Sequence, residues 1–232
     1  MALSFSSFDK RRYRTVGVQD GYAQWAPTYE GTVLDLMDLR LLARLEAVDW
    51  RAASNVLDLA CGTGRVGVWL KNKGVRQLTG VDFTEAMLRQ AGEKSVYDAL
   101  VLADVAHTDL QSNVYDLIVE SLADEHFERL EPFYVEAARL CSRDGRLVLV
   151  GYHPHFVMLG MPTHFNSATG EPLAVETHVH LMSDHVTAAH RSGFRLQEMV
   201  EGVIDDHWLA AKPKWETFRD HPISFAMAWQ KA

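Results

Sequence analysis

The sequence of 232 residues is poor in cysteine, with only Cys61 and Cys141. Two cysteines do not form the disulfide framework of a small secreted protein, so we expect free thiols in a reducing compartment such as the cytoplasm. The sequence also lacks any apolar run close to the ~20 residues that span a bilayer. Residues 1–14 contain no apolar stretch followed by a cleavage site, so we expect neither a membrane partner nor a secretion signal.

The sequence also contains fewer basic than acidic residues. The chain has 23 Lys and Arg residues against 31 Asp and Glu residues, which gives a formal net charge of −8. A general nucleic-acid-binding protein needs a basic face, so we expect no nucleic-acid partner. Apolar residues make up 47% of the sequence, and this length suffices for one globular domain with a full core. We therefore treat residues 1–232 as a single domain, in a monomer or a homodimer.

Short apolar segments alternate with segments of helical periodicity over most of the chain. We predict strands over 55–59, 78–82, 99–103, 115–120 and 146–151. Helices between them are predicted over 64–73, 84–92 and 131–141. A helix over 183–191 and strands over 195–204 and 224–230 complete the pattern. Such alternation is typical of an α/β fold, here a seven-stranded, mostly parallel sheet with helices on both faces.

Two segments fall outside this alternation. Residues 1–31 are polar and aromatic, and residues 32–48 carry apolar side chains at helical spacing, so we predict an N-terminal helical cap. Prolines and glycines interrupt residues 152–182, where we predict an insertion after the fifth strand, with a hairpin turn at Thr169-Gly170 and an extended strand over 173–181. We expect the cap to cover a cofactor and the insertion to form a lid over a substrate.

The first predicted strand ends in Asp58 and leads into a turn that contains Gly62 and Gly64. Both glycines permit positive φ and leave the backbone free to lie against a ligand. A loop that grips a pyrophosphate offers backbone N–H groups, and a carboxylate on the same rim would repel that anion. Asp58 therefore favours a ligand with positive charge, and S-adenosylmethionine (SAM) carries both a sulfonium and an α-ammonium group.

Carboxylates also follow the next three predicted strands, as Asp82, Asp104 and Glu120. Ligands of open α/β sheets bind beyond the carboxyl ends of the strands, which is where these residues lie. A carboxylate at the second strand can accept hydrogen bonds from both ribose hydroxyls, and an acceptor at the third can bind the exocyclic amine of adenine. The pattern therefore predicts a site for an adenosine-containing cofactor.

These motifs resemble those of the class I SAM-dependent methyltransferases. Residues 58–64 resemble motif I of that family, residues 81–88 its ribose-binding turn, and residues 115–119 and 145–149 its fourth and fifth strands. Arg143-Asp144-Gly145 stands where the family usually has Pro-Gly-Gly. The resemblance implies a Rossmann-like α/β fold, SAM as cofactor with S-adenosylhomocysteine (SAH) as its product, and methyl transfer as the reaction.

The resemblance also implies a set of cofactor-binding residues. Those at the strand ends are Asp58, Ala60, Cys61, Gly62, Thr63, Gly64, Asp82, Phe83, Met87, Asp104, Val105 and Glu120. Near the N-terminus, Tyr22, Trp25 and Tyr29 resemble the segment that closes over SAM in many small-molecule methyltransferases. The same three aromatic residues fit the apolar face of an amphipathic helix equally well.

Four histidines are candidates for a catalytic base. His126 follows the fourth strand and His153 follows the fifth. His178 and His180 alternate with Glu176 on the strand predicted over 173–181, so their side chains would share one face. Imidazole suits this role because its unperturbed pKa lies near neutrality. No histidine spacing matches a specific metal signature, and we predict no metal site.

The predicted function is transfer of the SAM methyl group to a small molecule, at oxygen, at an activated carbon or at nitrogen. The cap and the insertion would close a pocket of suitable size for such an acceptor. Two alternatives stay open. Residues 62–67 also spell G-x-G-x-x-G, the fingerprint of an NAD(P)-dependent oxidoreductase, which is weak evidence by itself. A SAM-binding protein without methyl transfer would use the same cofactor site.

Overall fold

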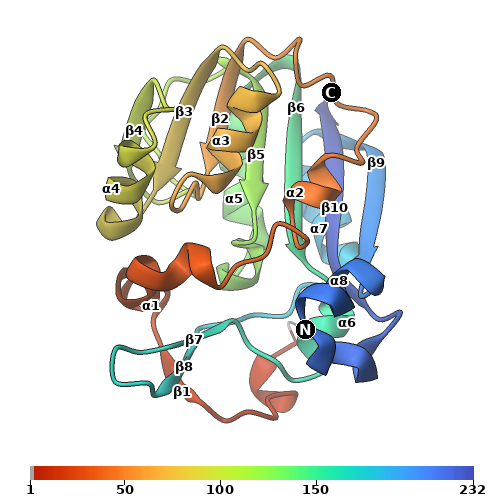
Figure 1. Ribbon diagram of the computed structural model, residues 1–232. Helices are drawn as coiled ribbons and strands as arrows, with labels where there is room; N and C mark the ends of the chain where they lie inside the picture. Colours follow the sequence, from red (N-terminus) through yellow and green to blue (C-terminus); the bar gives the residue numbers. More distant parts are fainter. Residues whose placement is uncertain (1–2) are drawn as a thin grey trace.

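The computed structural model describes residues 3–232, so the first two residues of the predicted cap lie outside the described part of the chain. A seven-stranded sheet with the order β4-β3-β2-β5-β6-β10-β9 forms the centre of the molecule (Figure 1). Its strands are β2 (Asn55–Leu59), β3 (Gln77–Asp82), β4 (Ala99–Leu102), β5 (Tyr115–Ser121), β6 (Cys141–Tyr152), β9 (Phe194–Val203) and β10 (Pro222–Lys231). All run parallel except β10, which is antiparallel to its neighbours β6 and β9. The predicted mostly parallel α/β sheet is confirmed.

Helices cover both faces of this sheet because successive strand residues point to opposite sides. Val148 and Val150 of β6 face one core together with α2 (Leu39–Leu42) and α3 (Arg65–Asn72). Leu147 and Leu149 of the same strand face a second core together with α5 (Leu130–Leu140) and α7 (Met182–Arg191). The remaining helices of the sheet domain are α4 (Glu85–Glu93), α6 (Pro154–Met158) and α8 (Asp206–Ala211). Among residues 3–232, no helix has the length and apolar composition needed to cross a bilayer.

The N-terminal segment and the predicted insertion meet in a second, three-stranded sheet. It consists of β1 (Arg14–Val16), β8 (Pro172–Val175) and β7 (His164–Asn166), with β8 in the middle. The strand β8 is parallel to β1 and antiparallel to β7, and Gly170 adopts a φ of 83° in the β7–β8 turn. Figure 1 shows this sheet at the end of the large sheet where α1 (Val18–Trp25) also lies. A small apolar cluster of Trp25, Phe165, Leu173 and Val175 joins the two segments.

The helix expected over residues 32–48 is largely replaced by turns, since only α2 is regular helix there. The apolar residues Leu41, Leu42 and Leu45 are nevertheless buried on the large sheet. Asp38 explains part of the irregular path, because its carboxylate accepts a hydrogen bond from Leu39 N and pairs with the Arg65 guanidinium. The periodicity therefore identified a buried segment but not its backbone conformation.

The strand expected over 173–181 is also shorter than predicted, because β8 ends at Val175. Glu176 N still donates to Val16 O, but His178 N donates instead to Glu125 O in the segment after β5. After Glu176 the backbone therefore leaves the small sheet and hydrogen-bonds to the segment that follows β5 of the large sheet. Glu176, His178 and His180 therefore do not lie on a regular strand, although their side chains still lie together, with His178 Nε2 3.8 Å from Glu176 Oε1 and the His178 and His180 rings stacked at 6.4 Å.

Candidate functional site

A cavity of about 350 Å³ lies beyond the carboxyl ends of β2, β3, β4 and β5. The N-terminal segment forms one wall of this cavity, and the segment leading into α5 forms another. Among the predicted site residues, ten line it: Tyr22, Tyr29, Ala60, Gly62, Asp82, Phe83, Met87, Asp104, Val105 and His126. The structure thus brings together residues that lie more than a hundred positions apart in the sequence.

The turn after β2 presents its backbone to the cavity. Gly62 has a φ of 53° and Gly64 a φ of 85°, as the sequence predicts. No atom lies within 4 Å of where a Gly62 Cβ would stand, so a ligand has free access to this backbone. Ala60, which also lines the cavity, has a φ of 57°, a conformation that costs an alanine about 1 kcal/mol or more. Leu122 after β5 has a φ of 60°, so two strained residues border the same cavity.

Asp82 connects the turns that follow β2 and β3. Its Oδ2 accepts a hydrogen bond from Gly62 N at 2.9 Å, and its Oδ1 accepts one from Thr84 N at 2.8 Å. Burial raises the pKa of this carboxyl, although these backbone donors act in the opposite direction. Each carboxylate oxygen keeps a further acceptor position, which is what two ribose hydroxyls require.

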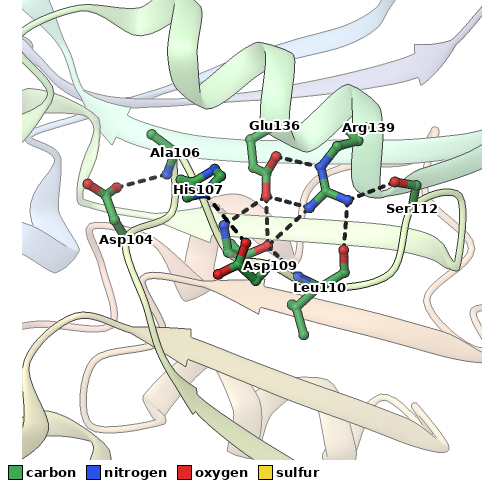
Figure 2. A network of polar contacts seen from close by, with 9 residues as sticks. Asp104, Ala106, His107, Asp109, Leu110, Ser112, Glu136 and Arg139 are labelled. Carbon is green, nitrogen blue, oxygen red and sulfur yellow. Dashed lines mark hydrogen bonds and ion pairs between the residues drawn. The ribbon is translucent and has the colours of Figure 1, made fainter.

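Asp104 lies at the start of a loop that is fixed to α5. The Glu136 carboxylate accepts hydrogen bonds from Thr108 N and from the Arg139 guanidinium, which also donates to Leu110 O (Figure 2). Asp104 itself accepts a hydrogen bond from Ala106 N at 2.8 Å, which leaves one carboxylate oxygen free. The loop therefore holds Asp104 and Val105 at the cavity without using the acceptor that a cofactor amine needs.

The N-terminal segment is attached to the cofactor side of the sheet by side-chain contacts to backbone. Gln19 Nε2 donates to Phe83 O, and Gln90 Nε2 of α4 donates to Ala26 O, both at 2.7 Å. These contacts place Tyr22 and Tyr29 in the cavity wall. The N-terminal tyrosines and the turn after β3 therefore border the same cavity.

His126 is enclosed between the N-terminal segment and the insertion, with a side chain only 4% exposed. Its Nδ1 lies 2.6 Å from Glu176 O, and its Nε2 lies 2.9 Å from the Tyr22 hydroxyl. A carbonyl oxygen only accepts, so Nδ1 carries the proton and Nε2 of the neutral ring must accept from Tyr22. Burial lowers the pKa of His126 to about 4, so the ring is neutral near pH 7.

Six predicted cofactor residues lie outside the cavity lining. Trp25 is buried against Phe165, with ring centroids 5.4 Å apart. Glu120 is fully buried and accepts a hydrogen bond from Ala123 N at 2.7 Å. Cys61, Thr63 and Gly64 belong to the turn but are buried away from the cavity or absent from its lining. Asp58 is also buried, and its carboxylate accepts a hydrogen bond from the Tyr97 hydroxyl at 2.6 Å.

Three of the four candidate bases also lie away from the cavity lining. His153 Nε2 is 2.8 Å from Glu201 Oε1 at the edge of the sheet, and His180 Nε2 is 2.7 Å from Phe127 O. His178 is 3.8 Å from Glu176. Of the four, only His126 borders the cavity. In the described part of the chain, no three His, Cys, Asp or Glu residues are placed to share a metal ion.

Several cavity residues were not anticipated. They are Val18, Thr84, Ala106, Ser121, Leu122, Ala123, Phe127, Glu128, Arg129, Pro132 and Phe133. Most follow β5, where the sequence motif ended at Glu120 and the next residues had no recognised pattern. Their place directly after a parallel strand is the signal that would have identified them.

The part of the chain that contains most of the cavity residues is also the part that resembles known proteins. A methyltransferase domain family matches residues 57–149. The chain is 37% identical over 115 residues to Methyltransferase-like protein 27 of Homo sapiens, and the aligned region covers 44% of this chain and 46% of that protein. It is 33% identical over 94 residues to the malonyl-[acyl-carrier protein] O-methyltransferase of Hamiltonella defensa subsp. Acyrthosiphon pisum (strain 5AT), covering 40% of this chain and 36% of that one. The chain thus spans half or less of the length of these curated relatives.

A solved structure shares the whole fold. The SAM-dependent methyltransferase from Mesorhizobium loti superposes with a TM-score of 0.66 at 21% identity, covering 92% of this chain and 100% of that chain. The open backbone of Gly62 and the carboxylates of Asp82 and Asp104 border the cavity, which is compatible with the same cofactor. Residues 57–149 thus match a methyltransferase domain family and the whole chain has the fold of a SAM-dependent methyltransferase, and together these findings support a class I SAM-dependent methyltransferase with SAM as its cofactor.

Proposed function

We propose that this chain transfers the methyl group of SAM to a small molecule and that His126, acting with Tyr22, removes the acceptor's proton. The observation that carries the proposal is the 2.9 Å contact between His126 Nε2 and the Tyr22 hydroxyl in the cavity wall. Oxygen is the favoured acceptor atom, with nitrogen or an activated carbon as the other candidates. One similar protein is by name an O-methyltransferase, which supports this preference.

The hydrogen bonds around His126 prepare it to take up a proton. The carbonyl of Glu176 keeps the proton on Nδ1, so the lone pair of Nε2 faces the Tyr22 oxygen. SAM supplies an electrophilic methyl group on its sulfonium. As a hydroxyl acceptor forms its bond to the methyl carbon, the carbon–sulfur bond would break with its electron pair staying on sulfur, which gives SAH. The acceptor's O–H passes its proton to the Tyr22 oxygen while Tyr22 passes its own proton to His126 Nε2. Tyr22 ends the step neutral, and His126 ends it as an imidazolium.

The low pKa of His126 is compatible with this step. A hydroxyl oxygen that is gaining a methyl group becomes strongly acidic, so a weak base suffices if it is already in place. Burial raises the pKa of Tyr22 well above its usual range, so the free phenolate plays no part and the two proton shifts are concerted. Placement, rather than basicity, is the contribution of this pair.

The enclosure favours a small acceptor over a macromolecule. The N-terminal segment and the insertion are joined through β1 and β8, and Trp25 stacks on Phe165 between them. Tyr22 and His126 border the cavity, and the insertion lies behind them through the hydrogen bond between Glu176 O and His126 Nδ1, an arrangement suited to limiting the access of water to the methyl group. We infer that both segments, 1–31 and 152–182, act as covers of one domain.

An acceptor screen that measures SAH formation tests this proposal. With an accepted substrate, His126→Ala should lower kcat by about 10²–10⁴-fold, the usual contribution of a positioned base, and Tyr22→Phe should also lower it. His190→Ala, at an exposed position on α7, is the matched control and should retain activity. Full turnover by His126→Ala would refute the role of His126. SAH binding without turnover of any acceptor would favour a SAM-binding protein of different chemistry.

A further inference from the structure

Positive charge, which is scarce in the chain as a whole, is concentrated in one short stretch of the N-terminal cap. Residues 9–14 contain four basic side chains and one acidic side chain, so they carry a net charge of +3 in a chain whose total is −8. The basic residues are Lys10, Arg11, Arg12 and Arg14, and all four are exposed. A local excess of one charge on a chain of the opposite sign indicates a surface that attracts a charged partner.

Most of this positive charge is not neutralised within the molecule. In the described part of the chain, the side chains of Lys10, Arg11 and Arg12 form no ion pair with an aspartate or a glutamate. Asp9 lies next to them, but its Oδ1 accepts hydrogen bonds from Arg11 N and Arg12 N at 2.9 and 3.0 Å. The three cations therefore remain available to an anionic partner without the loss of an internal contact.

The basic stretch is fixed against the insertion. Lys10 N donates to Gly160 O at 3.2 Å, and the two segments approach so closely that a Cβ at Gly160 would stand 2.4 Å from Phe8 O. Arg14 begins β1, which pairs with β8, and its guanidinium pairs with Glu171 at 3.2 Å. Because this backbone is already ordered, binding of a partner costs little further conformational entropy.

Apolar and aromatic side chains accompany the cations. Leu3 is 40% exposed although it is apolar, and Phe5, Phe8 and Tyr13 are only half-buried. Basic side chains beside accessible apolar and aromatic ones are typical of protein segments that lie in the interface of an anionic bilayer. A lipid surface would use both components, whereas attraction to an acidic protein accounts for the cations alone.

We propose that residues 3–14 form a docking surface that binds an anionic lipid bilayer peripherally and reversibly. The cations would interact with the acidic headgroups, and the apolar side chains would enter the headgroup region. The expectation that the chain has no membrane partner rested on the lack of a spanning segment, and peripheral binding requires none. Figure 1 shows the beginning of the chain at the same end of the molecule as the small sheet, so this attachment brings the cap toward the bilayer.

Cosedimentation of the full chain with lipid vesicles tests the proposal without any cofactor or acceptor. We expect the protein to bind vesicles of phosphatidylcholine mixed with phosphatidylserine and to bind pure phosphatidylcholine vesicles far more weakly. Binding should fall as the salt concentration rises, because ions screen the attraction between exposed charges. Equal binding to both kinds of vesicle, or binding to neither, would overturn the proposal whatever the outcome of the acceptor screen.

A triple variant identifies the surface responsible. Replacement of Lys10, Arg11 and Arg12 by glutamine should lower the partition coefficient on the mixed vesicles about a hundredfold, since each basic residue near an anionic surface contributes about fivefold. The variant should keep the wild-type unfolding temperature, because all three side chains are exposed. Wild-type partitioning of the folded variant would refute the role of this stretch.

A matched control separates local charge from total charge. Replacement of Arg76, Arg89 and Arg191 by glutamine removes three other exposed cations and should leave the partitioning unchanged. An equal loss of binding in this control would show an effect of total charge and overturn the assignment to residues 3–14. Binding to a polyglutamate peptide without binding to the mixed vesicles would assign the cations to an acidic protein and overturn the lipid surface.

Discussion

Asp82 is the residue on which the cofactor site depends most directly. Its carboxylate holds Gly62 N and Thr84 N, and so fixes the turns after β2 and β3 relative to each other. Asp82 also lines the cavity, and each of its oxygens retains an acceptor position that we expect a ribose hydroxyl to use. One side chain thus joins backbone geometry to ligand recognition.

Replacement of this residue should therefore weaken cofactor binding. We expect Asp82→Ala to reduce the affinity for SAM by about 1.5–3 kcal/mol, the typical scale of hydrogen bonds to a charged group. Calorimetric titration measures the difference. Glu93→Ala removes the same charge from an exposed position at the end of α4 and should leave the affinity unchanged. An Asp82→Ala variant with wild-type affinity would mean that this carboxylate does not contact the ribose.

At this scale the sequence predicts where a carboxylate lies but not where it points. Asp82 ends β3 and Asp104 follows β4, and both line the cavity, whereas Asp58 near the end of β2 and Glu120 near the end of β5 are buried away from it. The difference comes from distant partners. The Tyr97 hydroxyl donates a hydrogen bond to the Asp58 carboxylate, and no local sequence pattern predicts a contact between residues 39 positions apart.

Among the elements, the segment after β5 forms a large part of the cavity wall. It supplies Leu122, Ala123 and His126 to the cavity. Behind it, Asp124 is buried, with Oδ2 3.3 Å from His185 Nε2 on α7. The end of β6 leaves room for this carboxylate only because residue 151 is glycine, where a Cβ would lie 2.4 Å from Asp124 Oδ1.

Adding that methyl group should displace the whole segment. We expect Gly151→Ala to lower the free energy of unfolding by about 1–3 kcal/mol, as overpacking in a dense core usually does, and to reduce turnover by moving His126. Denaturant titration and kcat measure the two effects. Gly31→Ala is the matched control, because nothing lies within 4 Å of its Cβ position. Unchanged stability and turnover in Gly151→Ala would contradict the claim that glycine at this position is needed to hold Asp124 and the segment after β5 in place.

Element type was predictable wherever local pattern and tertiary packing agree. The strands and helices of the large sheet appear within a few residues of the predicted bounds, because a parallel sheet buries continuous apolar runs. Residues 32–48 and 176–181 were mispredicted because side-chain and backbone contacts to other segments override their periodicity. The ion pair of Asp38 with Arg65 and the hydrogen bond from His178 N to Glu125 O are examples.

At the scale of the whole molecule, the two segments outside the large sheet act together. One precedes the sheet and the other follows β6, yet they form a shared three-stranded sheet and a shared apolar cluster. Of the two, only the N-terminal segment lines the cavity, through Val18, Tyr22 and Tyr29, while the insertion contacts this wall through the hydrogen bond between Glu176 O and His126 Nδ1. The sequence predicts both segments separately, but the pairing of β1 with β8 joins residues about 160 positions apart and has no local signal.

The central claim is that this enclosure binds SAM, and calorimetric titration with SAH and, separately, with NADH tests it most directly. The glycine turn and the carboxylate of Asp82 are compatible with either ligand, whereas Asp104 and the family match favour the adenosyl sulfide. We predict micromolar binding of SAH and no heat of binding from NADH. Binding of NADH without SAH would contradict the account and assign the cavity to a dinucleotide.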